Sequence, residues 1–318
     1  MNVDRDPAAS NDRNPFMNTA KTTVLVAGAS GRLGGLIAGH LLDQDGAVVR
    51  LLVRESAQAD PDKARKLDGL VARGASIVIG DVGDPESLDQ ATRGVDVVIS
   101  ALQGGADVIV DGQIALAEAA VRNGVRRFFP SDFALDLFAA PDGAPQFDLR
   151  KAADATIDPL PFEVVHVLNG AFMDMMLDPN RAGIVNLQTN KARLWGTGDE
   201  PFNLTTADDT ARFTARLATD PSDVSGVRIV SGAETTFNTI IAEAERLTST
   251  KMTVQVLGDA DDLRRIIADA DHAWSVVREW YFLSMITVPP FVATDNDRYP
   301  DLQLTTLDDY LTDLAHES

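Results

Sequence analysis

The amino-acid sequence predicts an α/β fold, in which a doubly wound parallel sheet is followed by a smaller C-terminal lobe. Three observations indicate this fold. Short apolar runs alternate with helical segments over the first half of the chain. A glycine-rich turn joins the first apolar run to the first helical segment. Beyond about residue 172 the alternation weakens, and strand, turn and amphipathic helix patterns are mixed.

Six strands are predicted from short apolar runs in which β-branched residues are frequent. They cover residues 22–28, 47–54, 75–81, 95–101, 125–132 and 161–170. Helical segments separate them, and one begins at Pro61, where proline suits a first helical turn. Strands joined through helices form βαβ units, so the pattern predicts a Rossmann-type parallel sheet covered on both faces.

The overall composition argues against several classes of protein and of site. The 318 residues carry a formal net charge of −20, from 48 acidic and 28 basic side chains, and such a field repels nucleic acid. No cysteine is present, so disulfides, thiolate nucleophiles and cysteine-bound metals are excluded. No apolar run approaches the length of a membrane helix, and the four histidines show no metal-ligand spacing, so neither a membrane segment nor a metal is predicted. A cytoplasmic protein is expected, and the sequence is compatible with a homodimer.

The turn "GASGRLGG" carries the clearest binding motif. Gly28, Gly31 and Gly34 have the Gly-x-x-Gly-x-x-Gly spacing of extended short-chain dehydrogenases. Glycine permits a tight turn and close approach of a pyrophosphate, whose charge meets the free N–H groups of a helix start. The residues predicted to bind a dinucleotide here are Gly28, Ala29, Ser30, Gly31, Arg32, Leu33 and Gly34.

The end of the second strand indicates the type of dinucleotide. An NAD enzyme usually places an acidic residue there, whereas this chain has Arg54. A guanidinium can bind a 2′-phosphate through paired hydrogen bonds, and Lys63 and Arg32 offer further positive charge. The pattern favours NADP(H). Glu55, if turned inward, would instead favour NAD.

The segment "QFDLRK" at 146–151 bears on catalysis. Ordinary short-chain dehydrogenases carry Tyr-x-x-x-Lys here, and this chain has Phe147 in the tyrosine position and Lys151 in the lysine position. Phenylalanine cannot exchange a proton. A partly buried lysine beside a cationic nicotinamide should have a lowered pKa, so we predict that Lys151 acts as the general acid or base and also contacts the cofactor.

Several longer runs resemble the isoflavone reductase-like group, which includes the phenylcoumaran benzylic ether reductases, within the NmrA-like atypical short-chain dehydrogenases. These runs are "RLLVRESAQADPDKARKL", "GDVGDPESLDQATRGVDVVISA", "RNGVRRFFPSDFALD" and "RYPDLQLTTLDDYL". The resemblance extends from about residue 21 to residue 314. It implies an NADPH-dependent reductase of a small aromatic, phenylpropanoid-like substrate, with the family's phosphate-binding pair on Arg54 and Lys63. Its catalytic lysine, from an F-x-x-K helix start, is placed on Lys151.

The predicted substrate pocket lies where the fifth and sixth strands end. Ser131 follows the fifth strand, Asn169 ends the sixth, and Phe172 and Met175 lie just beyond it. The resemblance implies that the segment after the sixth strand lines the pocket. His166, within the sixth strand, is either a structural histidine or a group of this site.

The predicted organisation has three parts. Residues 1–20 are polar and lack the apolar centre of a signal peptide, so a disordered N-terminal tail is expected. Residues 21–170 form the NADP-binding Rossmann domain. Residues 171–318 form mainly a substrate-binding lobe and partly return to the main sheet, since "VRIVSG" has the pattern of a late strand.

Two functions from different classes remain open at this stage. One is the reductase, for which quinones or aldehydes are alternative substrates. The other is a non-catalytic regulatory protein of the NmrA type, which senses NADP(H) and binds a protein partner. A lysine at position 151 favours the enzyme, because a sensor needs no proton donor there.

Overall fold

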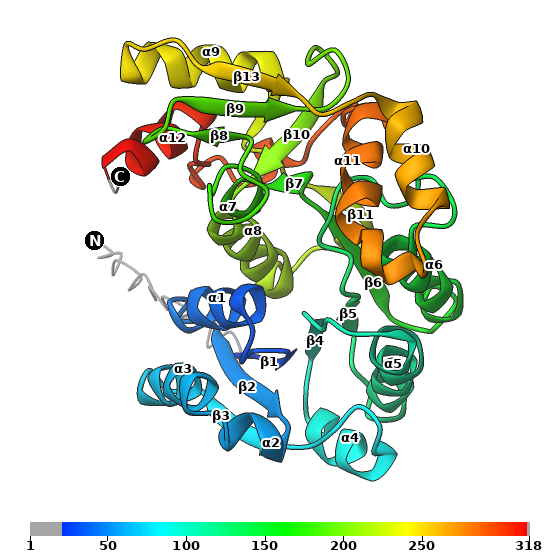
Figure 1. Ribbon diagram of the computed structural model, residues 1–318. Coiled ribbons are helices and arrows are strands. Elements are labelled where there is room, and N and C mark those ends of the chain that lie inside the picture. The colour runs from blue at the N-terminus through cyan, green and yellow to red at the C-terminus, as the bar shows by residue number, and fades with distance from the viewer. Residues whose placement is uncertain (1–20, 317–318) are drawn as a thin grey trace, which may run out of the picture.

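The computed structural model describes residues 21–316, so the tail predicted for residues 1–20 lies outside it. Figure 1 shows a parallel sheet with flanking helices in one half and smaller sheets with helices in the other. The predicted α/β class with a doubly wound parallel sheet is confirmed. None of the described helices is long and apolar enough to cross a membrane.

The main sheet has seven strands in the order β11-β6-β5-β4-β1-β2-β3, and every adjacent pair is parallel. The strands are β1 Thr22–Ala27, β2 Ala47–Val53, β3 Ser76–Ile79, β4 Val97–Ser100, β5 Arg127–Phe129, β6 Glu163–Leu168 and β11 Gly226–Ile229. β5 is shorter than the predicted 125–132. It ends before Pro130, which has no N–H to continue the ladder.

Helices cover both faces of this sheet, and each face has its own core. The helices are α1 Arg32–Leu42, α2 Glu55–Gln58, α3 Pro61–Ala72, α4 Pro85–Thr92, α5 Gln113–Arg122, α6 Pro145–Ile157 and α8 Ala207–Thr219, with a π-helical turn, Asp107–Gly112, before α5. Val24 and Val26 of β1 pack toward α1, α3 and α8, whereas Leu25 and Ala27 pack toward α4, α5 and α6. The alternation follows from the two-residue period of a strand and explains the apolar runs.

The second half of the chain builds a lobe with two three-stranded sheets, β12-β10-β7 and β13-β9-β8. Its strands are β7 Ala171–Phe172, β8 Val185–Asn186, β9 Lys191–Leu194, β10 Phe202–Thr205, β12 Ala233–Thr235 and β13 Thr253–Val256. Its helices are α7 Met173–Met176, α9 Phe237–Thr248, α10 Ala260–Ala268, α11 Val277–Thr287 and α12 Leu307–His316, with 3-10 turns at Ala273–Val276 and Asn296–Arg298. A separate hydrophobic core fills this lobe.

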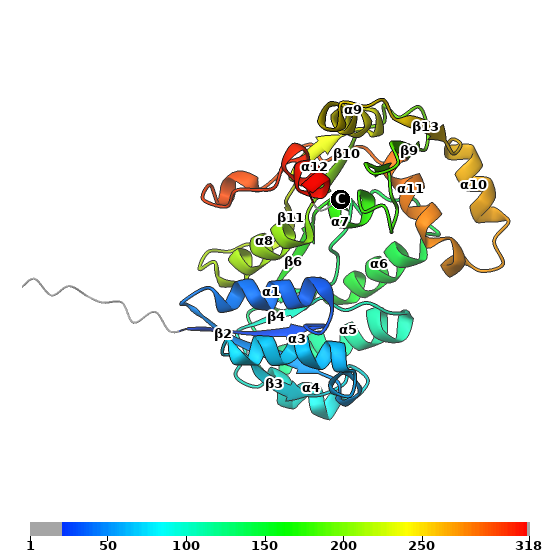
Figure 2. The same cartoon turned by 60° about the vertical axis from the view of Figure 1, so that its left-hand side comes forward.

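The two halves are interwoven. β11 pairs with β6 at the edge of the main sheet, and α8 packs beside α1 (Figure 2). Both elements come from the region after residue 171. The division at residue 170 stays a prediction, because these returning elements share the core of the main sheet.

Arg127 of β5 ties these returning elements to the sheet. Its side chain is fully buried and pairs through Nε with Glu163 of β6 at 2.6 Å. The guanidinium also donates to the carbonyl oxygens of Leu217, Asp220 and Ser222 at 2.6, 3.0 and 2.7 Å. One buried cation thus donates hydrogen bonds to carbonyl groups at the end of α8 and in the loop after it.

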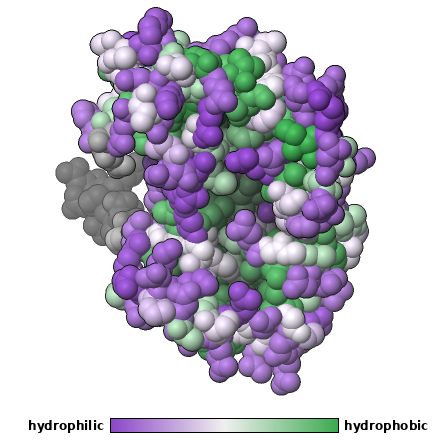
Figure 3. All heavy atoms as spheres, in the orientation of Figure 1, coloured by the Kyte–Doolittle hydropathy of each residue, from purple (hydrophilic) through white to green (hydrophobic). Residues whose placement is uncertain are grey.

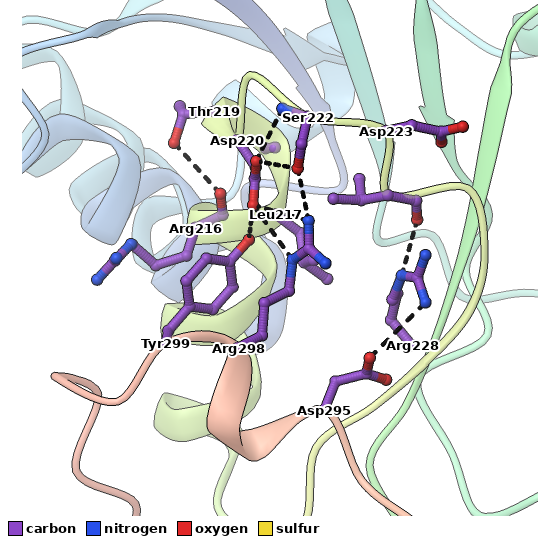
Figure 4. A network of polar contacts seen from close by, with 12 residues as sticks. Arg216, Leu217, Thr219, Asp220, Ser222, Asp223, Arg228, Asp295, Arg298 and Tyr299 are labelled. Carbon is purple, nitrogen blue, oxygen red and sulfur yellow. Dashed lines mark hydrogen bonds and ion pairs between the residues drawn. The ribbon is translucent and has the colours of Figure 1, made fainter.

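The C-terminal run "RYPDLQ" docks on the same loop (Figure 4). Tyr299 donates its hydroxyl to Asp220 at 2.6 Å, and Arg298 pairs with Asp220 and donates to Ser222 at 2.7 Å. Burial opposes ionisation of Asp220, but hydrogen bonds from Ser222 and Tyr299, with the charge of Arg298, hold its pKa well below the usual range. This segment is therefore fixed to the loop that follows α8.

Replacement of Arg127 by leucine should lower the free energy of unfolding by about 3–5 kcal/mol, because it leaves Glu163 and several carbonyl groups without their partner. Urea unfolding followed by circular dichroism measures this loss. Arg122→Leu is the control, since it removes only exposed ion pairs with Asp89 and Glu118 and should cost no more than about 1 kcal/mol. Equal losses in the two variants would contradict the role given to Arg127.

Candidate active site

A cleft of about 770 Å³ lies at the carboxyl ends of β1, β2, β3 and β4, where open α/β sheets bind their ligands. Figure 3 shows a hollow across the middle of this face, with apolar side chains in its depth. The lobe after residue 170 closes the cleft through Phe172, Asp174, Met175 and Arg181. The volume lies within the range of small-molecule sites.

The glycine turn forms one end of this cleft. Gly28 has φ +88°, and a Cβ atom there would lie 2.3 Å from the carbonyl oxygen of Ala101. A Cβ at Gly34 would lie 2.5 Å from the carbonyl oxygen of Gly28. Both glycines are therefore required for the turn to close between β1 and α1. Gly31 precedes α1 without a side-chain cap, so the first N–H groups of the helix are available to an anion.

Six of the seven residues predicted in this turn line the cleft, namely Gly28, Ser30, Gly31, Arg32, Leu33 and Gly34. Ala29 does not line it, because its side chain is fully buried in the core beneath the turn. Arg32 donates to Asp174 of α7 at 2.6 Å. The second oxygen of Asp174 accepts from the backbone N–H of Ala207 at 2.6 Å. Arg32 therefore connects the glycine turn to the second lobe.

Arg54 ends β2 and lines the cleft, and among the described residues its guanidinium has no hydrogen-bond or ion-pair partner. Lys63 does not line the cleft and pairs with Asp60, 3.3 Å away at the start of α3. Glu55, the residue that would favour NAD, starts α2 as an exposed side chain outside the cleft lining. The wall thus presents one unpaired cation at the position expected for a 2′-phosphate.

The environment of Lys151 differs from the predicted one in two respects, while its catalytic role stays a prediction. Its side chain is absent from the cleft lining, and its Nζ lies 3.0 Å from Asp142 and 3.1 Å from Asp148. Burial opposes the charge on Lys151, but the hydrogen bonds to these two carboxylates raise its pKa above the ordinary value, whereas we predicted a lowered pKa. Lys151 is held as a charged group in an acidic cluster beside the helix.

Arg150 takes the place on the cleft wall that was predicted for Lys151. Phe147, with 1% of its surface exposed, packs against Tyr281 with ring centroids 5.7 Å apart. Each residue of a helix turns the chain by about 100°, so the third and fourth residues after Phe147 lie on opposite sides of it. An F-x-x-K count from Phe147 reaches Arg150 and not Lys151. The spacing in the sequence therefore indicated Arg150, whereas the prediction chose the residue after it.

A buried polar cluster lies behind this wall. Asp132 Oδ2 lies 2.8 Å from His166 Nδ1, and the other ring nitrogen of His166 lies 3.1 Å from Asp158. Burial opposes the charge on His166, but Asp132 raises its pKa above the ordinary value. Burial, reinforced by the charge of Asp132, raises the pKa of Asp154 to about 8. His166 is thus a structural part of this cluster and does not line the cleft.

The predicted substrate residues separate into two groups. Ser131, Phe172 and Met175 line the cleft, whereas Asn169 is fully buried and donates to the carbonyl oxygen of its neighbour Gly170 at 3.2 Å. The Ser131 hydroxyl donates to the carbonyl oxygen of Leu102 at 2.7 Å.

Several lining residues were missed by the sequence analysis, including Gln103, Phe133, Arg150, Asp174 and Arg181. Phe133 and Gln103 follow the ends of predicted strands, and this position relative to the sheet was an available signal. Arg181 and Asp174 lie in the irregular region, where no periodic pattern indicated which side chains face the cleft.

Comparisons with known proteins identify the family of the chain. A model of the NmrA-like family matches residues 20–310. Eugenol synthase 1 of Petunia hybrida is 25% identical over 93% of this chain and 99% of that protein. Phenylcoumaran benzylic ether reductase Pyrc5 of Pyrus communis is 26% identical over 92% of this chain and 98% of that protein. The solved structure of AtPrR2 with NADP⁺ and (+)pinoresinol superposes with a TM-score of 0.78 and 25% identity, over 92% of this chain and 98% of that one.

Asp154→Asn should change how stability depends on pH. Because the folded-state pKa of Asp154 is raised from 3.8 to about 8, the native protein holds a proton across that window that the unfolded chain releases. The contribution of Asp154 to stability is therefore full below pH 3.8 and is lost as pH rises toward 8. Asparagine cannot ionise, so the variant should unfold at a higher temperature than the wild type at pH 8.5. The difference should shrink as pH falls toward 5.

Thermal melts from pH 5 to 8.5 test this prediction. Asp158→Asn is the matched control, because its carboxyl side chain is 51% exposed at the edge of the same cluster. If the difference in unfolding temperature between the Asp154 variant and the wild type does not change with pH, the raised pKa given to Asp154 is wrong.

Proposed function

The chain belongs to the NmrA-like family, and on that premise we propose that it is an NADPH-dependent reductase of a small aromatic, phenylpropanoid-like substrate. The continuity of one cleft supports this proposal most directly. It runs from a phosphate-binding end, formed by the glycine turn and Arg54, to an end lined by Phe133, Phe172 and Met175. The cleft can therefore hold a dinucleotide and an aromatic ring side by side.

The residues at the first end fit NADP(H). The glycine turn leaves no room for a Cβ atom at Gly28 or Gly34, and the start of α1 offers N–H groups to a pyrophosphate. Arg54, whose guanidinium has no partner within the described chain, would bind the 2′-phosphate. Among the proteins to which this chain is similar, AtPrR2 has been solved with NADP⁺ and (+)pinoresinol. When bound, NADPH supplies the hydride for the reduction.

The residues at the second end determine what this chain contributes to the reaction. Phe133, Phe172 and Met175 exclude water and pack against an aromatic substrate. Hydride addition to an electron-poor carbon moves negative charge onto a conjugated oxygen of the substrate. The Arg150 guanidinium stabilises that charge as a fixed cation, and the remaining proton comes from water, since arginine does not exchange protons in proteins.

One observation supports a second function. Lys151, the predicted proton donor, does not line the cleft. A protein that binds NADP(H) without catalysing a reduction has no need of such a donor, so a redox-sensing regulatory protein is the alternative. The two functions differ in whether the bound dinucleotide is consumed.

NADPH oxidation in the presence of phenolic carbonyls, enones and benzylic ethers distinguishes the two functions. We expect the absorbance of NADPH at 340 nm to fall with at least one of these aromatic classes. If NADPH binds tightly and no compound in the three classes is reduced, the regulatory function replaces the reductase.

Arg54→Ala should weaken NADPH binding by about tenfold to a hundredfold and leave NADH binding unchanged, because it removes charge-assisted hydrogen bonds that only the 2′-phosphate can make. Fluorescence titration of both dinucleotides measures this preference. Lys63→Ala is the control, since this lysine pairs with Asp60 outside the cleft, and we expect a change of less than about threefold. A larger effect at Lys63 than at Arg54 would overturn the assignment of the phosphate site.

A further inference from the structure

Arg150 is an unpaired cation on the wall of the cleft. Four arginines line the cleft, and two of them have carboxylate partners, because Arg32 pairs with Asp174 and Arg181 pairs with Asp178. Arg54 and Arg150 have no carboxylate within ion-pair distance among the described residues. Arg54 is exposed and can be hydrated, whereas Arg150 is half-buried, so the unpaired guanidinium of Arg150 indicates an anionic ligand group at its part of the cleft.

The two unpaired arginines cannot serve the same phosphate. Arg54 follows β2, whereas α6, which carries Arg150, follows β5. β1 and β4 lie between these strands in the sheet order. With neighbouring strands about 4.8 Å apart, the ends of β2 and β5 are separated by roughly 14 Å. Since Arg54 is assigned to the 2′-phosphate, Arg150 faces a different part of the bound ligands.

The orientation of Arg150 is fixed by the backbone. Nε donates to the carbonyl oxygen of Ser131 at 2.6 Å, and Nη1 donates to the carbonyl oxygen of Gln146. No partner of Nη2 is present among the described residues, and the side chain lines the cleft beside Ser131 and Phe133. The guanidinium is therefore held in place without neutralisation of its charge.

The acidic residues behind the wall do not replace a ligand anion. Asp132 lies 2.8 Å from His166 and makes no ion pair with Arg150, although its charge acts on the guanidinium from behind the wall. Burial raises the pKa of Asp154 to about 8, which favours its neutral form at neutral pH. Burial lowers the pKa of Arg150 itself, but an arginine side chain remains charged in proteins. The positive charge of Arg150 is thus still available to the cleft.

We infer that Arg150 anchors an anionic oxygen of the aromatic substrate, a carboxylate or an ionised phenol, and so selects anionic aromatic compounds over neutral ones. This inference rests on the proposed function and adds the substrate class to it. A guanidinium binds such an oxygen with charge-assisted hydrogen bonds, and with two when a carboxylate presents both of its oxygens. A neutral analogue of the same shape leaves the half-buried cation unpaired, so it should bind more weakly.

Isothermal titration of the full chain saturated with NADP⁺ tests the inference with three compounds. They are 4-methoxycinnamate, which carries only a carboxylate, its neutral methyl ester, and methyl 4-hydroxycinnamate at pH 7 and at pH 10. The neutral methyl ester is also titrated at pH 10, because Asp154 loses its proton between these two pH values. The wild type should bind 4-methoxycinnamate or the ionised phenol about tenfold to a hundredfold more tightly than the neutral ester. The anionic probe that shows this gain identifies the kind of oxygen that Arg150 binds.

Arg150→Met should remove this gain and leave the affinity for the neutral ester within about threefold. Arg150→Lys should keep part of the gain in affinity, because lysine carries the positive charge but lacks the planar guanidinium group that forms paired hydrogen bonds. Lys151→Met is the matched control on the same helix, since that lysine pairs with Asp142 and Asp148 away from the cleft, and it should keep the full gain. Tight NADP⁺ binding by each variant shows that the variant is folded. If Arg150→Met does not fold, Arg150→Gln takes its place in the experiment.

The outcomes separate the two proposals. If NADP⁺ binds and the wild type does not distinguish anionic from neutral probes, or if Arg150→Met keeps the gain, the anchoring role is wrong and the reductase proposal stands. If NADP⁺ does not bind to the wild type, the proposed function itself fails.

Discussion

The burial of Phe147 determines the character of the whole site. This side chain fixes the rotation of α6 by packing in the core of the second lobe against Tyr281. Arg150 then faces the cleft, and Lys151, about 100° further round the helix, faces Asp142 and Asp148. A rotation by one residue would exchange a permanently charged donor for a group that exchanges protons. The chemistry available at the cleft therefore depends on a hydrophobic contact.

Most of the sheet could be predicted from the sequence because its central strands are buried on both faces and form nearly continuous apolar runs. The glycine turn and Arg54 could be predicted equally well. The tight turn requires glycine, and a residue at the end of β2 has a fixed place at the edge of the sheet. Ala29 and Asn169 were predicted as site residues because of their positions in the chain. Both side chains turn into the core, and the direction of a side chain is set by packing that single positions do not reveal.

The region after residue 171 was harder to predict because long-range polar contacts help to place its elements. Arg127 reaches from β5 to carbonyl groups around residue 220, and Tyr299 and Arg298 dock on Asp220 from the far end of the chain. No local periodicity indicates such contacts. They explain why the C-terminal run "RYPDLQ" stands out in the sequence, since it fixes α8 against the sheet and thereby holds the lobe that closes the cleft.

A crystal structure of the protein with NADP⁺ bound tests the central claim most directly. We predict electron density for the 2′-phosphate at Arg54 and for the nicotinamide at the end of the cleft that Arg150, Ser131 and Phe172 line. Lys151 should remain paired with Asp142 and Asp148. A nicotinamide ring in contact with Lys151, or a 2′-phosphate bound away from Arg54, would contradict this account.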